Sequence, residues 1–277
     1  MSAPFYVSPE QLMKDRAEFA RKGIARGRSV VVLRYDDGIL LLAENPSATL
    51  HKIAEIYDRI AFAAVGKYNE FETLRQAGVR YADLRGFSYD RADVTARGLT
   101  NAYAQTLASV FTTESKPFEV ELVVAEIGEH PSSDRLFRLS YDGSVADENE
   151  HVAIGGQAEE IGKRLSGLRT AGKPLAEVLA IGHTVLGTGR DEDVDLDDLE
   201  AAVLERSASS HRTFRRLQPD DLRALLAAPA TDEATTDEAT SGEGTGGDEA
   251  TTGEGTGGDE ATTASGADTE ARGDEGQ

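Results

Sequence analysis

Hydrophobic and polar positions along the chain follow two periods, and the first stretch has the period of a helix. Four apolar residues recur at three- to four-residue spacing and form one face: Met13, Ala17, Ala20 and Ile24. Before them, Ser8 is a favourable N-cap, Pro9 suits the first helical position, and Gln11 stands where it can complete a capping box. A helix with one buried face is therefore expected to begin near Ser8.

The period then changes to that of strands. The segment SVVVLRYDDGILLLAEN at residues 29–45 has two apolar runs around Asp37-Gly38, which is a strong hairpin signal. A second hairpin is expected from the runs Ile53–Tyr57 and Ile60–Val65. Because these runs are almost continuously apolar, we expect them to be covered on one whole face and partly on the other.

The same patterns predict the remaining elements. Helices are expected at residues 67–86, 93–111, 157–168, 174–187 and 219–227. Strands are expected at residues 118–126, 135–145 with a hairpin signal at Asp142-Gly143, 151–156, 201–204 and 214–217. The order is helix, four strands, two helices, three strands, two helices, two strands and helix, which is typical of α+β proteins. Two stacked antiparallel sheets between pairs of helices would bury every apolar face, so a four-layer α-β-β-α sandwich is predicted.

The last segment has a different composition. Residues 229–277 contain 14 acidic residues and one Arg, and most of the chain's net charge of −21 lies there. The eleven-residue sequence GEGTGGDEATT occurs at 242–252 and again at 253–263, without an aromatic or large aliphatic residue. A calcium-binding β-roll has another repeat length and a recurring hydrophobic residue. We therefore expect a folded domain over 10–228 followed by a disordered acidic tail over 229–277.

Composition excludes several classes of function. Without Cys there is no disulfide framework and no thiolate metal site, and the five His have no pair at i,i+4 spacing that would hold a metal. The negative net charge disfavours nucleic acid as a partner. The N-terminus lacks a signal-peptide pattern, and no apolar run approaches the ~20 residues of a membrane helix. We expect a cytoplasmic protein without cofactor, metal, nucleic-acid or membrane partner.

Two candidate catalytic motifs are incomplete. The segment GLRTAGKP at 167–174 has the glycine and lysine spacing of a phosphate loop, but Pro174 stands where a magnesium-binding Ser or Thr is needed, and the segment joins two predicted helices. A threonine nucleophile that uses its own α-amine as base would follow the glycine of a self-cleaved junction. Before the first strand the sequence is Gly27-Arg28-Ser29, so no Thr stands there.

Long segments of the chain resemble one protein family. They are the capped N-terminal helix, GRSVVVLRYDDGILLLAEN, KIAEIYDRIAFAAVGKYNEFETL, GFSYDRADVTARGLTNAYAQ and the region YDGSVADEN…AIGG. Over about residues 1–226 the chain closely resembles α-type subunits of bacterial (actinobacterial) 20S proteasomes. This resemblance implies the sandwich fold of N-terminal nucleophile hydrolases. It also implies a noncatalytic subunit whose heptameric outer rings cap the catalytic β-type rings, which are threonine proteases.

The resemblance gives Lys52 a role that the pattern alone does not. Because lysine is seldom buried, the pattern favours a solvated charge at a strand end. In the family, pockets between neighbouring α subunits accept the C-terminal tails of activator ATPases; the pocket lysine corresponds to Lys52 and two pocket glycines to Gly27 and Gly66. An ammonium can pair with a terminal carboxylate, and glycines let a backbone approach closely. Asn45 stands where catalytic members carry an acidic residue.

A gate and a set of partners are also implied by the resemblance. The gate segment, residues 1–9, includes Ser2, Ala3, Pro4, Phe5, Tyr6, Val7, Ser8 and Pro9. Phe5-Tyr6-Val7-Ser8 replaces the Tyr-Asp-Arg motif of archaeal and eukaryotic α subunits, so no gating contact is carried over. The implied partners are β-type subunits, other copies of this chain, a ring-shaped ATPase, and substrates tagged with a prokaryotic ubiquitin-like protein.

Two other functions are alternatives. The chain could be a catalytic, self-processing amidohydrolase or threonine-type peptidase that is cleaved before Ser29. The capped, apolar-faced N-terminal helix disfavours this alternative, because such a helix is expected to fold and be retained. The chain could also be a free-standing acidic binding protein that uses its tail, in which case it would be a monomer.

Overall fold

Two antiparallel sheets of five strands form the centre of the described part of the chain. The structure is a computed structural model that describes residues 8–189 and 194–227, so the predictions for gate residues 1–7 and for the tail lie outside the described residues. The first sheet has the order β10-β9-β2-β1-β8, with β1 (Val30–Tyr35), β2 (Gly38–Glu44), β8 (His151–Ile154), β9 (Leu199–Glu205) and β10 (Phe214–Leu217). The second has the order β3-β4-β5-β6-β7, with β3 (Ile53–Tyr57), β4 (Ile60–Gly66), β5 (Val120–Glu126), β6 (Arg135–Leu139) and β7 (Val145–Glu148).

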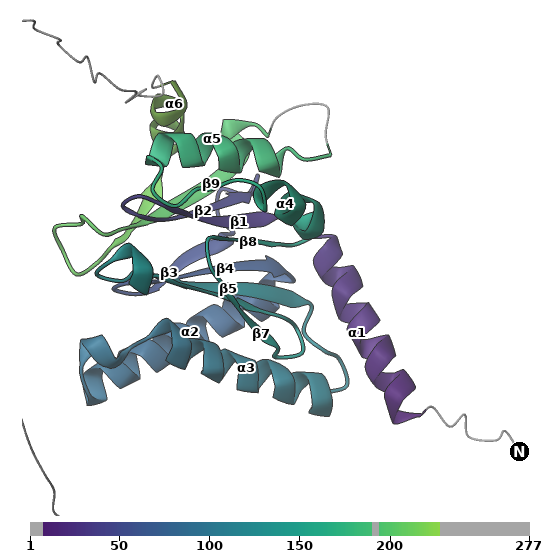
Figure 1. Cartoon of the computed structure of the whole chain (residues 1–277). Coiled ribbons are helices and arrows are strands. Elements are labelled where there is room, and N and C mark those ends of the chain that lie inside the picture. Colours follow the sequence, from purple (N-terminus) through teal and green to yellow (C-terminus); the bar gives the residue numbers. More distant parts are fainter. Residues whose placement is uncertain (1–7, 190–193, 228–277) are drawn as a thin grey trace, which may run out of the picture. The chain divides into compact units, whose positions relative to one another are not determined.

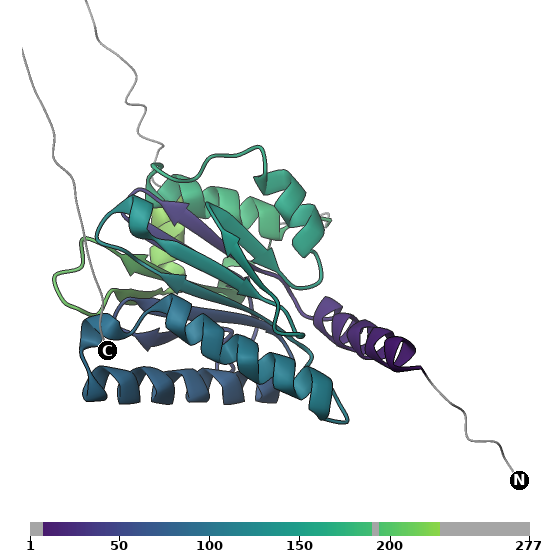
Figure 2. The same ribbon diagram turned by 60° about the horizontal axis from the view of Figure 1, so that its bottom comes forward.

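Helices cover the outer faces of both sheets (Figure 1). The α-helices of the described residues are α1 (Pro9–Ala25), α2 (Tyr68–Ser88), α3 (Ala96–Thr113), α4 (Ala158–Leu165), α5 (Leu175–Leu186) and α6 (Pro219–Ala227). Short 3-10 turns lie at η1 (Arg91–Asp93), η2 (Pro131–Ser133) and η3 (Leu196–Asp198). Helices α4, α5 and α6 pack on the first sheet, and α2 and α3 lie side by side on the second (Figure 2).

Three layers of apolar side chains lie between the sheets and helices and hold the four-layer structure together. Along β1, Val30 and Val32 pack between the two sheets, while Val31 and Leu33 pack against the helices on the outer face. This alternation follows from the two-residue period of a strand. The second sheet does the same on β4, where Ala63 faces the first sheet and Phe62 faces α2 and α3. The predicted α+β four-layer sandwich is confirmed.

Helix α1 is set apart from these layers. Its N-cap is confirmed, because the Gln11 backbone N–H donates to Ser8 Oγ at 3.2 Å. The expected capping box is wrong: the Gln11 side chain does not turn back to the Ser8 N–H, and its amide instead donates forward to Asp15 Oδ1 at 2.6 Å. Ala20 and Ile24 are buried against Tyr141 and anchor the C-terminal half of the helix.

Two expectations about the strands need correction. The segment between α3 and α4 contains four strands instead of three, because β7 pairs with β6 as an exposed edge strand whose residues lack an apolar face. The first hairpin turns at Asp36-Asp37, one residue earlier than predicted, since Tyr35 pairs with Gly38. Gly38 is the first residue of β2, where a Cβ would lie 1.9 Å from the Leu204 carbonyl oxygen.

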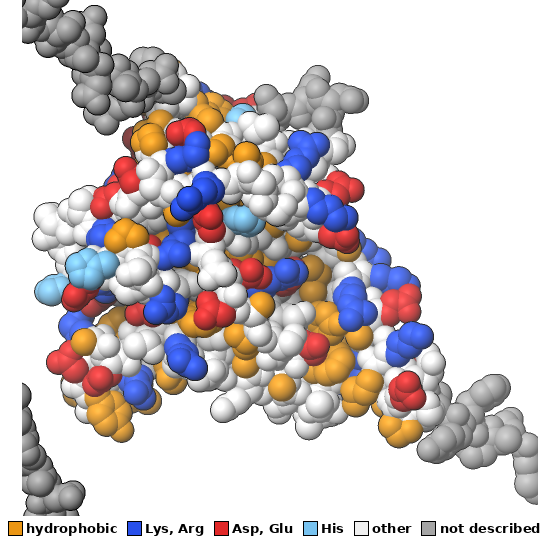
Figure 3. All heavy atoms as spheres, viewed as in Figure 1, with side chains coloured by type: hydrophobic (Ala, Val, Ile, Leu, Met, Phe, Trp, Pro, Cys, Tyr) orange, Lys and Arg blue, Asp and Glu red, His pale blue; other side chains and the backbone are white. Residues whose placement is uncertain are grey.

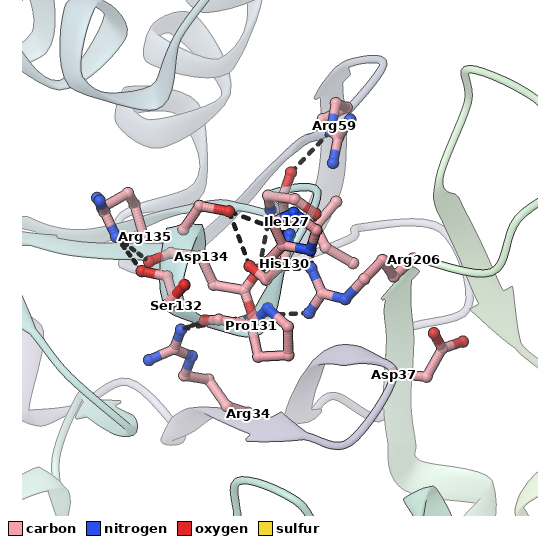
Figure 4. A network of polar contacts seen from close by, with 12 residues as sticks. Arg34, Asp37, Arg59, Ile127, His130, Pro131, Ser132, Asp134, Arg135 and Arg206 are labelled. Carbon is pink, nitrogen blue, oxygen red and sulfur yellow. Dashed lines mark hydrogen bonds and ion pairs between the residues drawn. The ribbon is translucent and has the colours of Figure 1, made fainter. Parts of the chain in front are cut away.

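A buried carboxylate ties the two sheets together where β1 and β9 end (Figure 4). Asp134, which precedes β6, is 4% exposed and accepts two hydrogen bonds of 3.0 Å from the Arg206 guanidinium. It also accepts from the Gly128 backbone N–H at 2.8 Å, and Arg34 of β1 lies 3.5 Å away. Since a buried carboxylate needs its donors, this network fixes the end of the sandwich.

We predict that Asp134→Ala lowers the free energy of unfolding by about 3–5 kcal/mol, because it leaves the Arg206 charge buried without its partner. Urea unfolding of the purified chain measures the effect. The control is Asp220→Ala, which breaks an ion pair to Arg223 with an Asp220 side chain that is 97% exposed. The control should be much less destabilising. Equal losses in the two variants would contradict the prediction.

Candidate functional site

The segment from α1 to β1 crosses directly against the end of β4. Gly27 follows the C-cap of α1, and its N–H donates to the Ile24 carbonyl at 2.9 Å. A Cβ at Gly27 would lie 2.4 Å from Val65 Cγ1 and 3.4 Å from the Gly66 nitrogen. Gly27 and Gly66 are therefore neighbours, and a side chain at position 27 would force the crossing apart.

Gly66 is the last residue of β4 and has a backbone conformation that favours glycine. Its φ is +122°, and a Cβ there would lie 1.9 Å from the Glu119 carbonyl oxygen. The same carbonyl accepts from the Lys67 N–H at 2.9 Å, so the chain turns from β4 toward α2 at close range to β5. Any other residue at this position would be strained, both by the positive φ and by the close contact with Glu119.

Lys52 lies at the same end of the sandwich, just before β3. Its carbonyl accepts from the Ala64 N–H at 3.0 Å, which places it beside β4. Its ammonium group donates to the Arg28 carbonyl at 2.8 Å and to the Glu44 carbonyl at 3.0 Å. Because Arg28 follows Gly27, the structure brings together Gly27, Lys52 and Gly66. The lysine bridges the start of β3 to the strand ends of the other sheet.

The surroundings of Lys52 alter its proton affinity. Burial lowers the pKa of Lys52 from 10.5 to about 8, and the nearby charge of Arg28 acts in the same direction. The carboxylates of Glu44 and Glu200 oppose this shift. Lys52 therefore stays mainly protonated at neutral pH and becomes neutral more readily than a solvated lysine.

Sequence reasoning missed Glu200, whose carboxylate is hydrogen-bonded to the backbone of Lys52. Glu200 is 8% exposed on β9, and its carboxylate accepts from the backbone N–H of Lys52 at 2.8 Å. The Asn45 side chain donates to the same carboxylate at 2.8 Å and to the Leu50 carbonyl at 2.7 Å. The available signal was an acidic residue, Glu200, in the second position of the otherwise apolar run LEAAVL of β9.

The segment before β1 holds a buried serine. Helix α1 ends at Ala25, and residues 26–29 connect it to β1. Ser29, the residue before β1, is 6% exposed, and its hydroxyl accepts from the Gln157 backbone N–H at 3.2 Å. Ser29 therefore serves as a buried hydrogen-bond acceptor between the start of β1 and the segment that follows β8.

Other candidate chemistry finds no site in the described residues. The segment 167–174 joins α4 to α5, as predicted, and does not follow a strand as a phosphate loop would. Within the described ranges no group of three or more His, Asp or Glu side chains could hold a metal ion. The helices of those ranges include none that is long and apolar enough to cross a membrane.

The four-layer sandwich has the fold of the N-terminal nucleophile hydrolases. A family model described as "Proteasome subunit" matches residues 24–195. "Proteasome subunit alpha" of Xylanimonas cellulosilytica is 68% identical over 239 residues, covering 83% of this chain and 98% of that protein. The chain belongs to the proteasome subunit family, and within it to the α type found in bacteria.

Relatives from other genera agree with this assignment. "Proteasome subunit alpha" of Kineococcus radiotolerans is 61% identical over 235 residues, covering 82% of this chain and 99% of that protein. "Proteasome subunit alpha" of Streptomyces scabiei is 55% identical over 247 residues, covering 88% of this chain and 98% of that protein. The relatives are thus matched over nearly their whole length, and the chain assembles with other proteasome subunits as an α subunit.

We predict that Gly66→Ala lowers the free energy of unfolding by about 1–3 kcal/mol, because alanine strains both the positive φ and the contact with Glu119. Thermal or urea unfolding measures the loss. Gly167→Ala is the matched control, since nothing lies within 4 Å of a Cβ there. A Gly66→Ala chain as stable as the Gly167→Ala chain would show that the close crossing is not required.

Proposed function

We propose that this chain is a noncatalytic subunit of a 20S proteasome core. Copies of it form the heptameric outer rings, and β-type subunits beneath them carry the threonine peptidase activity. The observation that supports this most is the sequence Gly27-Arg28-Ser29 before β1: no Thr follows the glycine, and the Ser29 hydroxyl is buried and accepts from the Gln157 backbone N–H. The proposed place of action is the cytoplasm.

An exposed apolar surface supports assembly. Leu84, Phe87 and Tyr89, at the C-terminal end of α2, are 69%, 90% and 74% exposed. Figure 3 shows exposed hydrophobic side chains at several places in the lower half of this face, among them the lower left, where α2 ends, with basic and acidic side chains between them. Large exposed apolar groups that lie together are typical of surfaces that another subunit covers.

We further propose that Gly27, Lys52 and Gly66 receive the C-terminal carboxylate of a ring-shaped activator ATPase. The ATPase would deliver proteins tagged with a prokaryotic ubiquitin-like protein. The charged ammonium of Lys52 supplies an electrostatic partner, and Gly27 and Gly66 are both partly exposed nearby, where a peptide can approach without meeting a side chain at either position. Residues Ser2–Pro9 form the gate that admits substrates; Ser8 and Pro9 also begin α1.

The activator proposal predicts that Lys52→Ala weakens ATPase-stimulated degradation by about 10–100-fold, because a hydrogen bond to a charged group is lost. The variant is coexpressed with its β-type partner, and degradation of a tagged protein is measured with and without the ATPase. Ring assembly and basal peptide hydrolysis should stay unchanged.

A second lysine serves as the control for this experiment. Lys163 on α4 is 71% exposed and pairs with Glu159 on the same helix, so Lys163→Ala also removes a positive charge. Lys163→Ala should leave stimulation at the wild-type level. Unchanged stimulation in Lys52→Ala would return Lys52 to the role of a structural bridge between strand ends.

The gate proposal predicts that deletion of residues 2–7 speeds hydrolysis of short peptides by the coexpressed particle. This deletion keeps the Ser8 cap, so α1 should remain folded. Peptide hydrolysis without ATPase is the measurement, and electron microscopy confirms intact particles. Hydrolysis no faster than that of the full-length particle would place the barrier elsewhere.

A further inference from the structure

The carboxylate of Glu200 has an unusually full set of donors. Its donors are the backbone N–H of Lys52 at 2.8 Å, the backbone N–H of Ile53 at 3.2 Å, the Asn45 side-chain amide at 2.8 Å and the Arg216 guanidinium at 2.6 Å. A carboxylate has about four acceptor sites, so these donors fill it. Glu200 is thus held in one position at the start of β3.

Arg216 extends this arrangement into a clamp. One of its nitrogens donates to Glu200 and another donates to the Ile53 carbonyl at 2.8 Å. Glu200 and Arg216 lie on β9 and β10 of the first sheet, whereas Ile53 begins the edge strand of the second sheet. Glu200 and Arg216 together therefore hydrogen-bond to both the N–H and the carbonyl of Ile53, and so connect the two sheets.

The clamp determines where Lys52 stands. Its backbone N–H is fixed by Glu200, and the following residue, Ile53, is fully buried. From that position the side chain reaches the carbonyls of Arg28 and Glu44. A carboxylate that holds the backbone of a lysine also favours the charged form of its side chain, and Glu200 does this together with Glu44.

We propose that Glu200 is the residue that positions Lys52 for an activator's carboxylate and helps to keep its ammonium charged. This inference rests on the proposed docking function of Lys52. The activator does not touch Glu200 in this arrangement; the residue acts through the Lys52 backbone and charge.

Charged groups surround Lys52 on several elements, and Glu44, Glu200 and Arg28 act on its pKa. Glu44 lies at the end of β2, Glu200 on β9, Arg28 before β1 and Arg216 on β10, and His51 precedes Lys52 with its Nδ1 3.3 Å from Glu200. Above the pKa of Lys52, carboxylate binding should fall by up to about tenfold per pH unit. Loss of the Glu200 charge should move this fall to lower pH.

Strands β9 and β10, which carry Glu200 and Arg216, also supply a matched control. Glu205 also lies on β9 and also pairs with an arginine of β10, since Arg215 Nε donates to it at 2.9 Å. Glu205 is at the other end of the strand from Glu200, away from the start of β3. Glu205→Gln therefore removes the same charge and the same kind of pair without changing the Lys52 backbone.

The experiment uses particles of the full-length chain coexpressed with its β-type partner. The probe is a fluorescent peptide with the C-terminal sequence of the organism's ring ATPase, compared with the same peptide amidated at its C-terminus. Its affinity is measured from pH 6.5 to 9.5. Glu200→Gln should weaken binding of the acid peptide at least fivefold at pH 7 and lower the pH midpoint, and Glu205→Gln should do neither.

A second readout does not depend on docking. The rate at which an amine-reactive acetylating reagent modifies Lys52 is followed by mass spectrometry as a function of pH. The midpoint should fall in Glu200→Gln and stay unchanged in Glu205→Gln. Glu200→Asp should keep the midpoint, because the charge remains, but should weaken peptide binding, because the shorter side chain cannot reach both amides.

The possible failures are distinguishable. If Lys52→Ala binds the acid peptide as tightly as the wild type, the docking function is wrong, and the labelling midpoint still tests the effect of Glu200 on Lys52. If Lys52→Ala loses binding while Glu200→Gln matches Glu205→Gln in both readouts, the inference is overturned. Wild-type peptide binding in Glu200→Asp would overturn the positioning role. Should Glu200→Gln fail to assemble, Glu200→Asp carries the test alone.

Discussion

The constraint on which the structure depends is that each of its sheets is apolar on both faces. A sheet with one apolar face needs one covering layer, but a sheet such as that of β1 and β2 needs two. The two sheets cover each other on one side, and each must then recruit helices on the other. The four layers follow from this requirement.

Long apolar runs made most of this arrangement predictable from the sequence. The runs that form β1 to β4 are strongly marked, and their pairing as two hairpins needs only short turns. The prediction failed where a residue's role depends on distant neighbours. Strand β7 has an exposed edge and no pattern of its own, and Gly38 serves a close approach of β9 instead of the turn.

The candidate site, too, was only partly predictable from the sequence. Gly27, Lys52 and Gly66 were selected by resemblance to a family, and the structure brings them together through contacts that no local pattern specifies. Glu200 is separated from Lys52 by about 150 residues in the sequence, so its hydrogen bonds exist only after both sheets have formed. An acidic residue inside an apolar run indicates a buried partner, but it does not identify that partner.

The anchoring of α1 has a mechanical consequence. Ala20 and Ile24 hold the helix near the Gly27 crossing, while Leu12 and Phe19 remain exposed. A helix of 17 residues is about 25 Å long, so a tilt of one degree about the anchored end displaces the far end by about 0.4 Å. A change in the angle of α1 at its buried C-terminal half, near Gly27, would therefore displace Pro9 more than any other residue of the helix.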